Sequence, residues 1–222
     1  MKKITLFSVL AVMFAALSFT SCNTDSDNDS SLPSPTEAKA MLNAVAGYHS
    51  CGILFPGNNS TSESSKIEKD SVASGLRINA SDSTFIITDF PVKCLAKYIN
   101  DESLSQAVAA LPNQNLQGKL YPYSGSASSP LFCTLTQNID FTVDGKSVSL
   151  KFYGGYNPYA LAGYASSSTS SSTTSTPEYF VMYLTPGAIY VNDEYQSNAL
   201  KVANNSNYGT NSPYIIYLRY NL

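Results

Sequence analysis

An alternating run of apolar residues at positions 131–153 constrains the fold of this chain more than any other feature. Its first half keeps one parity, interrupted at Gln137, through Leu131, Cys133, Leu135, Ile139, Phe141 and Val143. Asp144-Gly145 is the preferred two-residue hairpin turn, and apolar residues return on the same face at Val148, Leu150 and Phe152. This register places Phe141 opposite Val148. A first strand running from residue 131 to 143 would span about 43 Å, which predicts a barrel or a strongly bent sheet.

Other segments alternate in the same way and extend an antiparallel sheet. Cys51, Ile53 and Phe55 share one face of a strand, and residues 76–88 form a hairpin whose inward residues are Leu76, Ile78, Phe85 and Ile87. We expect another hairpin at 179–194, which turns at Thr185-Pro186-Gly187-Ala188 and places Tyr183 opposite Tyr190. Residues 213–222 form the last strand.

Helical signals occur at the start and in the middle of this β-rich region. Ser34-Pro35-Thr36-Glu37 is a capping box with proline at the first helical position, and an apolar stripe follows through Val45. Residues 91–99 and a second capping box at Ser103–Gln106 predict a pair of short helices that act as a crossover or a lid. The expected fold class is α+β, dominated by antiparallel strands, with one N-terminal helix and a mid-chain helical pair.

The N-terminus is typical of an export signal. Residues 1–21 combine Lys2 and Lys3 with an apolar run too short to span a membrane, and small residues precede Cys22. Phe19-Thr20-Ser21-Cys22 resembles a bacterial lipobox, which implies cleavage before Cys22 and acylation of that residue. Residues 22–33 are polar and acidic and predict a disordered tether. A single domain at 34–222 follows, with disordered loops expected near 56–70 and 165–177.

These features together resemble the uncharacterised lipoproteins of Bacteroidales, in particular a domain-of-unknown-function family of about 200 residues. The resemblance implies an outer-membrane lipoprotein exposed at the cell surface, with a periplasm-facing location as the alternative, and membrane contact through the lipid alone. Asp70-Ser71-Val72 and Asp82-Ser83-Thr84 are similar to the short O-glycosylation sequon of exported Bacteroidales proteins, which implies modification at Ser71 and Ser83.

Composition excludes several classes of function. Without residues 1–21 the chain keeps 11 basic and 16 acidic residues, a net charge of −5, and no basic cluster, so we expect no nucleic-acid partner. His49 is the only histidine and is expected at the surface, and no catalytic motif, metal site or cofactor site is present. Cys51, Cys94 and Cys133 are expected as small buried residues, with a disulfide between two of them as the alternative.

Tyrosine is the one enriched residue type, with 16 in the chain and no tryptophan. On the expected 179–194 hairpin, Tyr179, Tyr183, Tyr190 and Glu194 would share the face away from the core, and flat aromatic rings beside polar groups suit sugars or peptides. The alternative is that tyrosines favour strands and pack beneath the helices. We expect a surface binding or accessory protein for a glycan or an envelope protein; an envelope hydrolase and a structural subunit are the alternatives.

Overall fold

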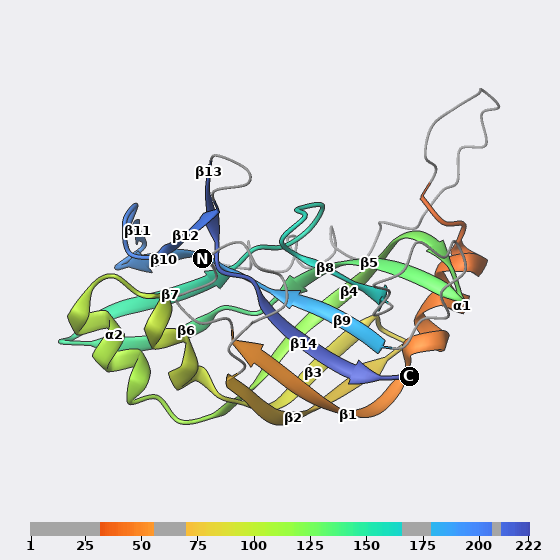
Figure 1. The fold of residues 1–222 in the computed structure, drawn as a ribbon, viewed down its shortest axis with the longest axis horizontal. Coiled ribbons are helices and arrows are strands. Elements are labelled where there is room, and N and C mark those ends of the chain that lie inside the picture. Colours follow the sequence, from red (N-terminus) through yellow and green to blue (C-terminus); the bar gives the residue numbers. More distant parts are fainter. Residues whose placement is uncertain (1–31, 56–69, 166–178, 206–209) are drawn as a thin grey trace, which may run out of the picture. The chain divides into compact units, whose positions relative to one another are not determined.

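Eight antiparallel strands close into a barrel in the computed structural model, which describes residues 32–55, 70–165, 179–205 and 210–222 (Figure 1). All described residues belong to one compact unit, Leu32–Leu222. The barrel strands are β1 (Gly47–Phe55), β2 (Asp70–Asn79), β3 (Thr84–Phe90), β4 (Gln114–Ser126), β5 (Ser129–Thr136), β8 (Leu161–Ala165), β9 (Tyr179–Leu184) and β14 (Ile216–Asn221). The predicted α+β class with a barrel of antiparallel strands is confirmed.

Two smaller sheets and three helices complete the described fold. A second sheet has the order β11-β10-β7-β6, and β12 pairs with β13 alone. The bounds are β6 (Ile139–Val143), β7 (Lys146–Phe152), β10 (Pro186–Val191), β11 (Glu194–Tyr195), β12 (Val202–Asn205) and β13 (Thr210–Pro213). The helices are α1 (Pro35–Val45), the 3-10 helix η1 (Val92–Tyr98) and α2 (Glu102–Ala109).

Helix α1 begins as its sequence predicts. The Ser34 hydroxyl accepts a hydrogen bond from the Glu37 backbone N–H, and the Glu37 carboxylate accepts from the Ser34 backbone N–H at 2.9 Å. Met41, Leu42 and Val45 form the buried face of the helix. Gly47 has a φ of +125°, a value that glycine alone adopts readily, and it starts strand β1 directly after the helix.

The mid-chain helices connect neighbouring strands. Strands β3 and β4 are antiparallel partners in the barrel, so η1 and α2 are an insertion between adjacent strands and the predicted crossover is wrong. The cap of α2 also differs from the prediction, because Asp101 accepts the hydrogen bond from the Leu104 N–H at 2.8 Å and the helix begins at Glu102. The Asp101 carboxylate caps the Leu104 amide. Because Asp101 lies two residues before Ser103, helix α2 starts earlier than predicted.

The long strand predicted at 131–143 is broken. Strand β5 ends at Thr136 in the barrel, and β6 starts at Ile139 in the second sheet. The inward parity changes across Gln137 and Asn138: Phe132 is fully buried in β5, whereas Leu135 is half exposed. The predicted turn and register of the second half are confirmed, because Asp144 and Gly145 have positive φ and Phe141 pairs with Val148.

The hairpin predicted at 179–194 is wrong. Strand β9 pairs with β8 and β14 in the barrel, whereas β10 pairs with β7 and β11 in the second sheet. Tyr183 therefore lies opposite Tyr217, and Tyr190 lies opposite Ser149. Thr185 lies between the two strands, and its carbonyl accepts a hydrogen bond from the Tyr153 N–H at 2.9 Å. This bond ties the chain to the end of β7 and directs it into the second sheet.

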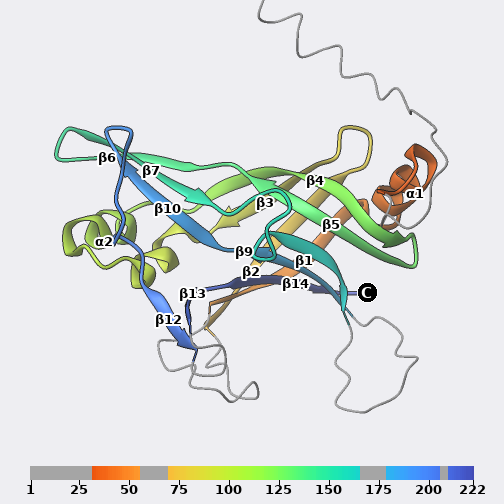
Figure 2. The same ribbon diagram turned by 90° about the horizontal axis from the view of Figure 1, so that it is seen from above.

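The three long insertions leave the barrel at one end. Because neighbouring barrel strands are antiparallel, β3, β5 and β9 run in the same direction, and each is followed by an insertion: the helices, the β6–β7 hairpin, and β10 to β13. Figure 1 shows α2, β6, β7 and β10 toward the left, with α1 and the C-terminus at the right. Figure 2 shows the same separation from above. Loops that share one end of a rigid barrel are a common place for binding sites.

Candidate functional site

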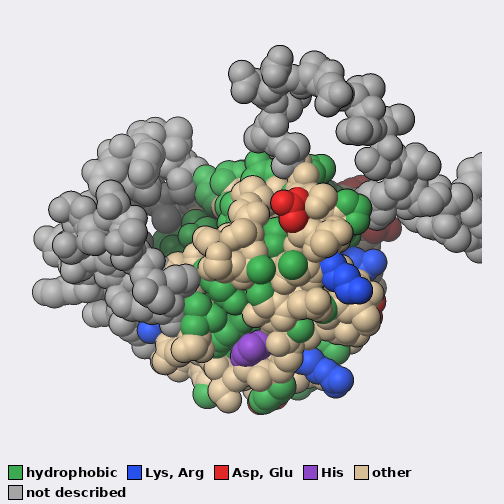
Figure 3. All heavy atoms as spheres, turned by 90° about the vertical axis from the view of Figure 1, so that its right-hand side faces the viewer, with side chains coloured by type: hydrophobic (Ala, Val, Ile, Leu, Met, Phe, Trp, Pro, Cys, Tyr) green, Lys and Arg blue, Asp and Glu red, His purple; other side chains and the backbone are tan. Residues whose placement is uncertain are grey.

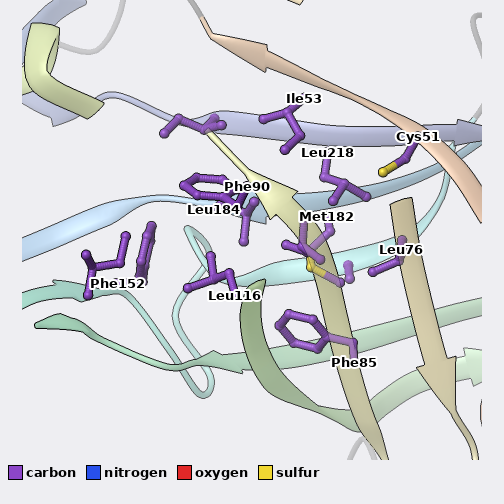
Figure 4. Packing of buried hydrophobic residues seen from close by; sticks show 14 of the residues in the cluster. Cys51, Ile53, Leu76, Phe85, Phe90, Leu116, Phe152, Met182, Leu184 and Leu218 are labelled. Carbon is purple, nitrogen blue, oxygen red and sulfur yellow. The ribbon is translucent and has the colours of Figure 1, made fainter. Parts of the chain in front are cut away.

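The interior of the barrel is filled by side chains. Phe85, Phe132, Phe180 and Met182 have at most 1% of their surface exposed. Figure 4 shows inward residues from β1, β2, β3, β9 and β14 meeting in one cluster. An eight-stranded barrel has an interior wide enough for side chains or for one small ligand, and here side chains occupy it. The candidate places for a binding site are therefore the surfaces outside the barrel interior.

Most tyrosines of the described structure are at least partly exposed. Tyr98 and Tyr220 are buried, five tyrosines are exposed, and the remaining described ones are partly buried. The exposed ones are Tyr48, Tyr121, Tyr123, Tyr156 and Tyr195. Most described tyrosines are thus neither fully buried nor fully exposed, and the interpretation that tyrosines favour strands and pack beneath the helices stays a prediction.

The outer face of the second sheet carries the exposed Tyr195 and the partly buried Tyr190. Asp140 of β6, Ser149 of β7, Tyr190 of β10 and Tyr195 of β11 form one row across the four strands, because each is the register partner of the next. Residues that are register partners project from the same side of a sheet. The opposite side carries Val148, Leu150 and Ile189, which are buried. The row therefore faces away from the core.

Close ring contacts order this face, which we call the tyrosine face and define as Lys151, Tyr153, Tyr159, Tyr190 and Tyr195. The Tyr190 and Tyr195 ring centres are 5.7 Å apart, and Lys151 Nζ lies 3.9 Å from the centre of the Tyr190 ring. Tyr153 and Tyr159 form a second pair at 5.4 Å. Tyr195 is 57% exposed. Flat rings beside an ammonium group offer stacking contacts and hydrogen-bond donors to one ligand.

The sequence-predicted binding residues do not form one group. Tyr190 lies on the tyrosine face, but Glu194 pairs with Val191 and therefore projects from the opposite side of the second sheet. Tyr179 and Tyr183 lie on barrel strand β9. There the Tyr183 ring packs edge-on against Tyr217 at 5.4 Å, and the Arg219 guanidinium lies over the Tyr179 ring at 4.7 Å.

Glu194 instead lines a cavity of about 420 Å³ on the inner side of the second sheet. The cavity lies between the start of α2 and the tips of the β6–β7 and β10–β11 hairpins. Valines and Leu104 contribute its apolar part, and its charged residues are Asp101, Asp144, Lys146 and Glu194. Two of the carboxylates have structural roles, because Asp101 caps α2 and Asp144 forms the hairpin turn with a φ of 49°.

The predicted modification sites lie in different settings. Ser71 is exposed and lies in strand β2, one residue after the strand begins. Ser83 is partly buried in the turn between β2 and β3 with a φ of 58°, and its carbonyl accepts a hydrogen bond from Leu120. Cys22 and the tether up to residue 31 lie outside the described residues, as do positions 56–69 and 166–177 of the predicted loops.

Two of the cysteines match the expectation of buried, unpaired thiols. Cys51 and Cys133 are 6% and 1% exposed and form no disulfide, and Cys94 is partly buried. Burial raises the pKa of Cys51 to about 11, against a smaller lowering by a hydrogen bond with Ser74. Burial raises the pKa of Cys133 as well. Raised thiol pKa values oppose a role for either residue as a nucleophile at neutral pH.

His49 is partly buried and packs against its neighbours, whereas the sequence predicts a surface position. Its ring stacks on Tyr220 with the centres 4.0 Å apart and the planes 6° apart, and its Nε2 lies 3.0 Å from the Val45 carbonyl oxygen. Figure 3 shows this histidine reaching the surface at the α1 end among hydrophobic and neutral polar groups. Within the described residues no cluster of histidine, cysteine and carboxylate side chains could hold a metal ion.

Sequence reasoning missed Lys151, Tyr153 and Tyr195 as members of one face. The Asp144-Gly145 register already gives Lys151 and Tyr153 one parity on the outer side of β7. The signal for Tyr195 is Asn192-Asp193, whose positive φ values of 48° and 65° form the two-residue turn that brings Tyr195 beside Tyr190.

A closed antiparallel barrel with a filled interior and a second sheet at one end defines the class of this protein. Residues 44–191 match the family described as a domain of unknown function (DUF4840), and the chain belongs to that family. The match includes the second sheet as far as β10 and stops before β14, the strand that closes the barrel. No curated protein and no solved structure matches the chain. No helix among the described residues is long and apolar enough to cross a membrane.

Proposed function

We propose that this protein is a lipid-anchored binding protein of the bacterial cell surface that holds a glycan on the tyrosine face. The supporting observation is the row formed by Ser149, Tyr190 and Tyr195, with Lys151 over the Tyr190 ring. Tyrosine loses little conformational entropy on binding and offers both an apolar ring and a hydroxyl. Ser149, Asp140 and Lys151 add hydrogen-bonding groups of the kind that sugar hydroxyls need.

Anchoring is the part of this proposal that rests on the N-terminal sequence. Cys22 would carry the acyl chains, and residues 23–33 would hold the domain away from the membrane at the cell surface, with a periplasm-facing location as the alternative. Two or more acyl chains anchor a protein stably where one does not. Detergent phase partition of native protein and of C22S tests this: wild type enters the detergent phase and C22S stays in the aqueous phase. Equal partition of the two would contradict anchoring at Cys22.

An immobilised panel of host, plant and bacterial surface glycans tests the binding part, with the full mature chain as the analyte. At least one glycan is expected to bind. Replacing Tyr195 by alanine should lower the affinity for that glycan about tenfold, because one stacked ring contributes on the order of 1 kcal/mol. The matched control is Y48A, which removes a similarly exposed tyrosine from barrel strand β1. No binding to any glycan, or equal effects of Y195A and Y48A, would exclude the proposal.

In the alternative function, an envelope hydrolase, the active site would be the cavity that Glu194 lines with Asp101 and Asp144. A glycosidase needs two carboxylates placed on either side of the scissile bond. Asp101 and Asp144 are engaged in a helix cap and a turn, which leaves Glu194 as the one carboxylate there without such a role. The geometry therefore favours binding over hydrolysis. The subunit alternative needed an unpaired edge at residues 213–222, and β14 is paired on both sides.

A further inference from the structure

The wall of the barrel carries a hollow that is separate from the tyrosine face. It has a volume of about 350 Å³ and is lined by Ser50, Gly52, Leu54, Ser71, Arg219, Tyr220 and Asn221. Strand β1 runs along its floor, between β2 and β14. The register places Gly52 beside Ala73 on one side and beside Arg219 on the other.

Gly52 is the reason that the wall is hollow at this point. A Cβ atom added to Gly52 would have no atom within 4 Å, so a side chain at this position would project into open space. Its outward neighbours on β1 are Ser50 and Leu54, since alternate residues of a strand share a face. The floor of the hollow is therefore backbone, and a ligand group can approach it closely.

Arg219 is the one charged residue among the described residues that line the hollow. Its guanidinium carbon lies 4.7 Å from the centre of the Tyr179 ring, which orients the group. The five N–H donors of a guanidinium lie in its plane, so stacking of one face on a ring leaves them available. The hydroxyls of Ser50 and Ser71 and the amide of Asn221 add neutral donors to the same hollow.

The charge of this surface is opposite to that of the chain as a whole. The chain has a formal net charge of −3 at pH 7, and Arg219 is one of its two arginines. Among the described residues that line the hollow there is no carboxylate. Arginine recognises carboxylate and sulfate or phosphate oxygens through paired hydrogen bonds. The hollow therefore selects for an anionic group.

We propose that this hollow is a second binding site that takes an acidic sugar through its carboxylate or sulfate group. The Arg219 guanidinium donates to the anionic oxygens, and Ser50, Ser71 and Asn221 hydrogen-bond the hydroxyls of the same sugar. The site lies on the barrel wall and is independent of glycan binding on the tyrosine face, so either can fail without the other.

Calorimetric titration of the mature chain tests the site with three oligosaccharides of equal length: a glucuronate, a sulfated sugar and a neutral glucan. We expect the glucuronate, the sulfated sugar or both to bind and the neutral one to bind at least tenfold more weakly. R219Q should weaken the acidic ligand at least tenfold. R77Q is the matched control, because it removes the other arginine, on strand β2, and should change the affinity less than twofold.

The G52L variant distinguishes loss of binding because a side chain fills the hollow from loss of binding because the fold is damaged. Because the Cβ position at Gly52 is open, this variant should unfold at the same temperature as wild type or above it, and it should lose binding of the acidic sugar. If R219Q weakens binding of the glucuronate, the recognised group is a carboxylate. If R219Q weakens binding of the sulfated sugar, the recognised group is a sulfate. Failure of both acidic sugars to bind, equal binding of the neutral one, or unchanged binding by folded R219Q or G52L would overturn the proposal.

Discussion

At the scale of single residues, burial decides how the cysteines behave. Cys51 lies inside the barrel, and desolvation raises its pKa to about 11; Cys133 is also buried, with a raised pKa. Because the thiolate is the reactive form, both thiols are mostly protonated, and therefore slow to react, at pH 8.

This predicts a labelling pattern. In C22S/C94S, which keeps only Cys51 and Cys133, a chromogenic disulfide reagent at pH 8 should label neither thiol in the folded protein and both in denaturant. The two readings come from one sample before and after unfolding. Rapid labelling of a thiol without denaturant would contradict the described burial.

The cap of α1 gives a pH-dependent prediction. Hydrogen bonds from the Ser34 side chain and backbone hold the pKa of Glu37 below its ordinary value of 4.5. A lowered folded-state pKa stabilises the fold above the unfolded pKa, and this stabilisation is lost as the pH falls through the folded pKa. S34A should therefore cost about 1 kcal/mol near pH 7 and less as the pH falls below 4.5.

Urea unfolding of four chains measures this effect: wild type, S34A, E37Q and the double variant. Glutamine keeps the capping geometry without titrating, so the cost of S34A on the E37Q background should not vary with pH in the acidic range. A pH dependence that survives in E37Q would assign it to another group.

At the scale of elements, β5 shows most clearly where tertiary structure overrides an apolar pattern. Residues 131–135 alternate in phase with β6, yet Phe132 is buried and Leu135 is half exposed. Phe132 packs against Phe180 at 6.5 Å within the core. F132A should therefore cost about 3 to 5 kcal/mol, and L135A about 1 kcal/mol or less.

Urea unfolding of these two variants decides which face of β5 is inward. L135A is the control on the same strand, removing a leucine that the alternating pattern alone would bury. Equal costs, or a larger cost for L135A, would restore the face expected from the pattern.

Local signals predicted most elements and failed where partners are distant in sequence. The capping box at Ser34, the Asp144-Gly145 turn and the 76–88 hairpin depend on neighbours within a few residues, and all three are confirmed. The 179–194 hairpin failed because β9 and β10 belong to different sheets, which Thr185-Pro186-Gly187 does not reveal. Glu194 and Tyr190 project from opposite sides for a local reason, because the turn at Asn192-Asp193 between them pairs Glu194 with Val191.

At the scale of the whole described domain, β14 closes the barrel. It pairs with β1 on one side and β9 on the other, and it buries Ile216, Leu218 and Tyr220. Deleting residues 215–222 should therefore abolish cooperative unfolding, because it exposes two strand edges and opens the core. Deleting Leu222 alone, which lies after β14, should leave the unfolding transition unchanged. Circular dichroism during heating compares the two; a cooperative transition in the longer deletion would contradict closure by β14.

The proposed binding face lies apart from the barrel interior, because it is formed by the insertions at one end. The tyrosine face belongs to those insertions, and its residues contribute surface more than core. Amide chemical-shift mapping of the protein, titrated with a glycan identified from the panel, tests this proposed face. We expect shifts concentrated at Ser149, Lys151, Tyr190 and Tyr195 that are lost in Y190A/Y195A. Shifts confined to the barrel strands, or unchanged in that variant, would contradict it.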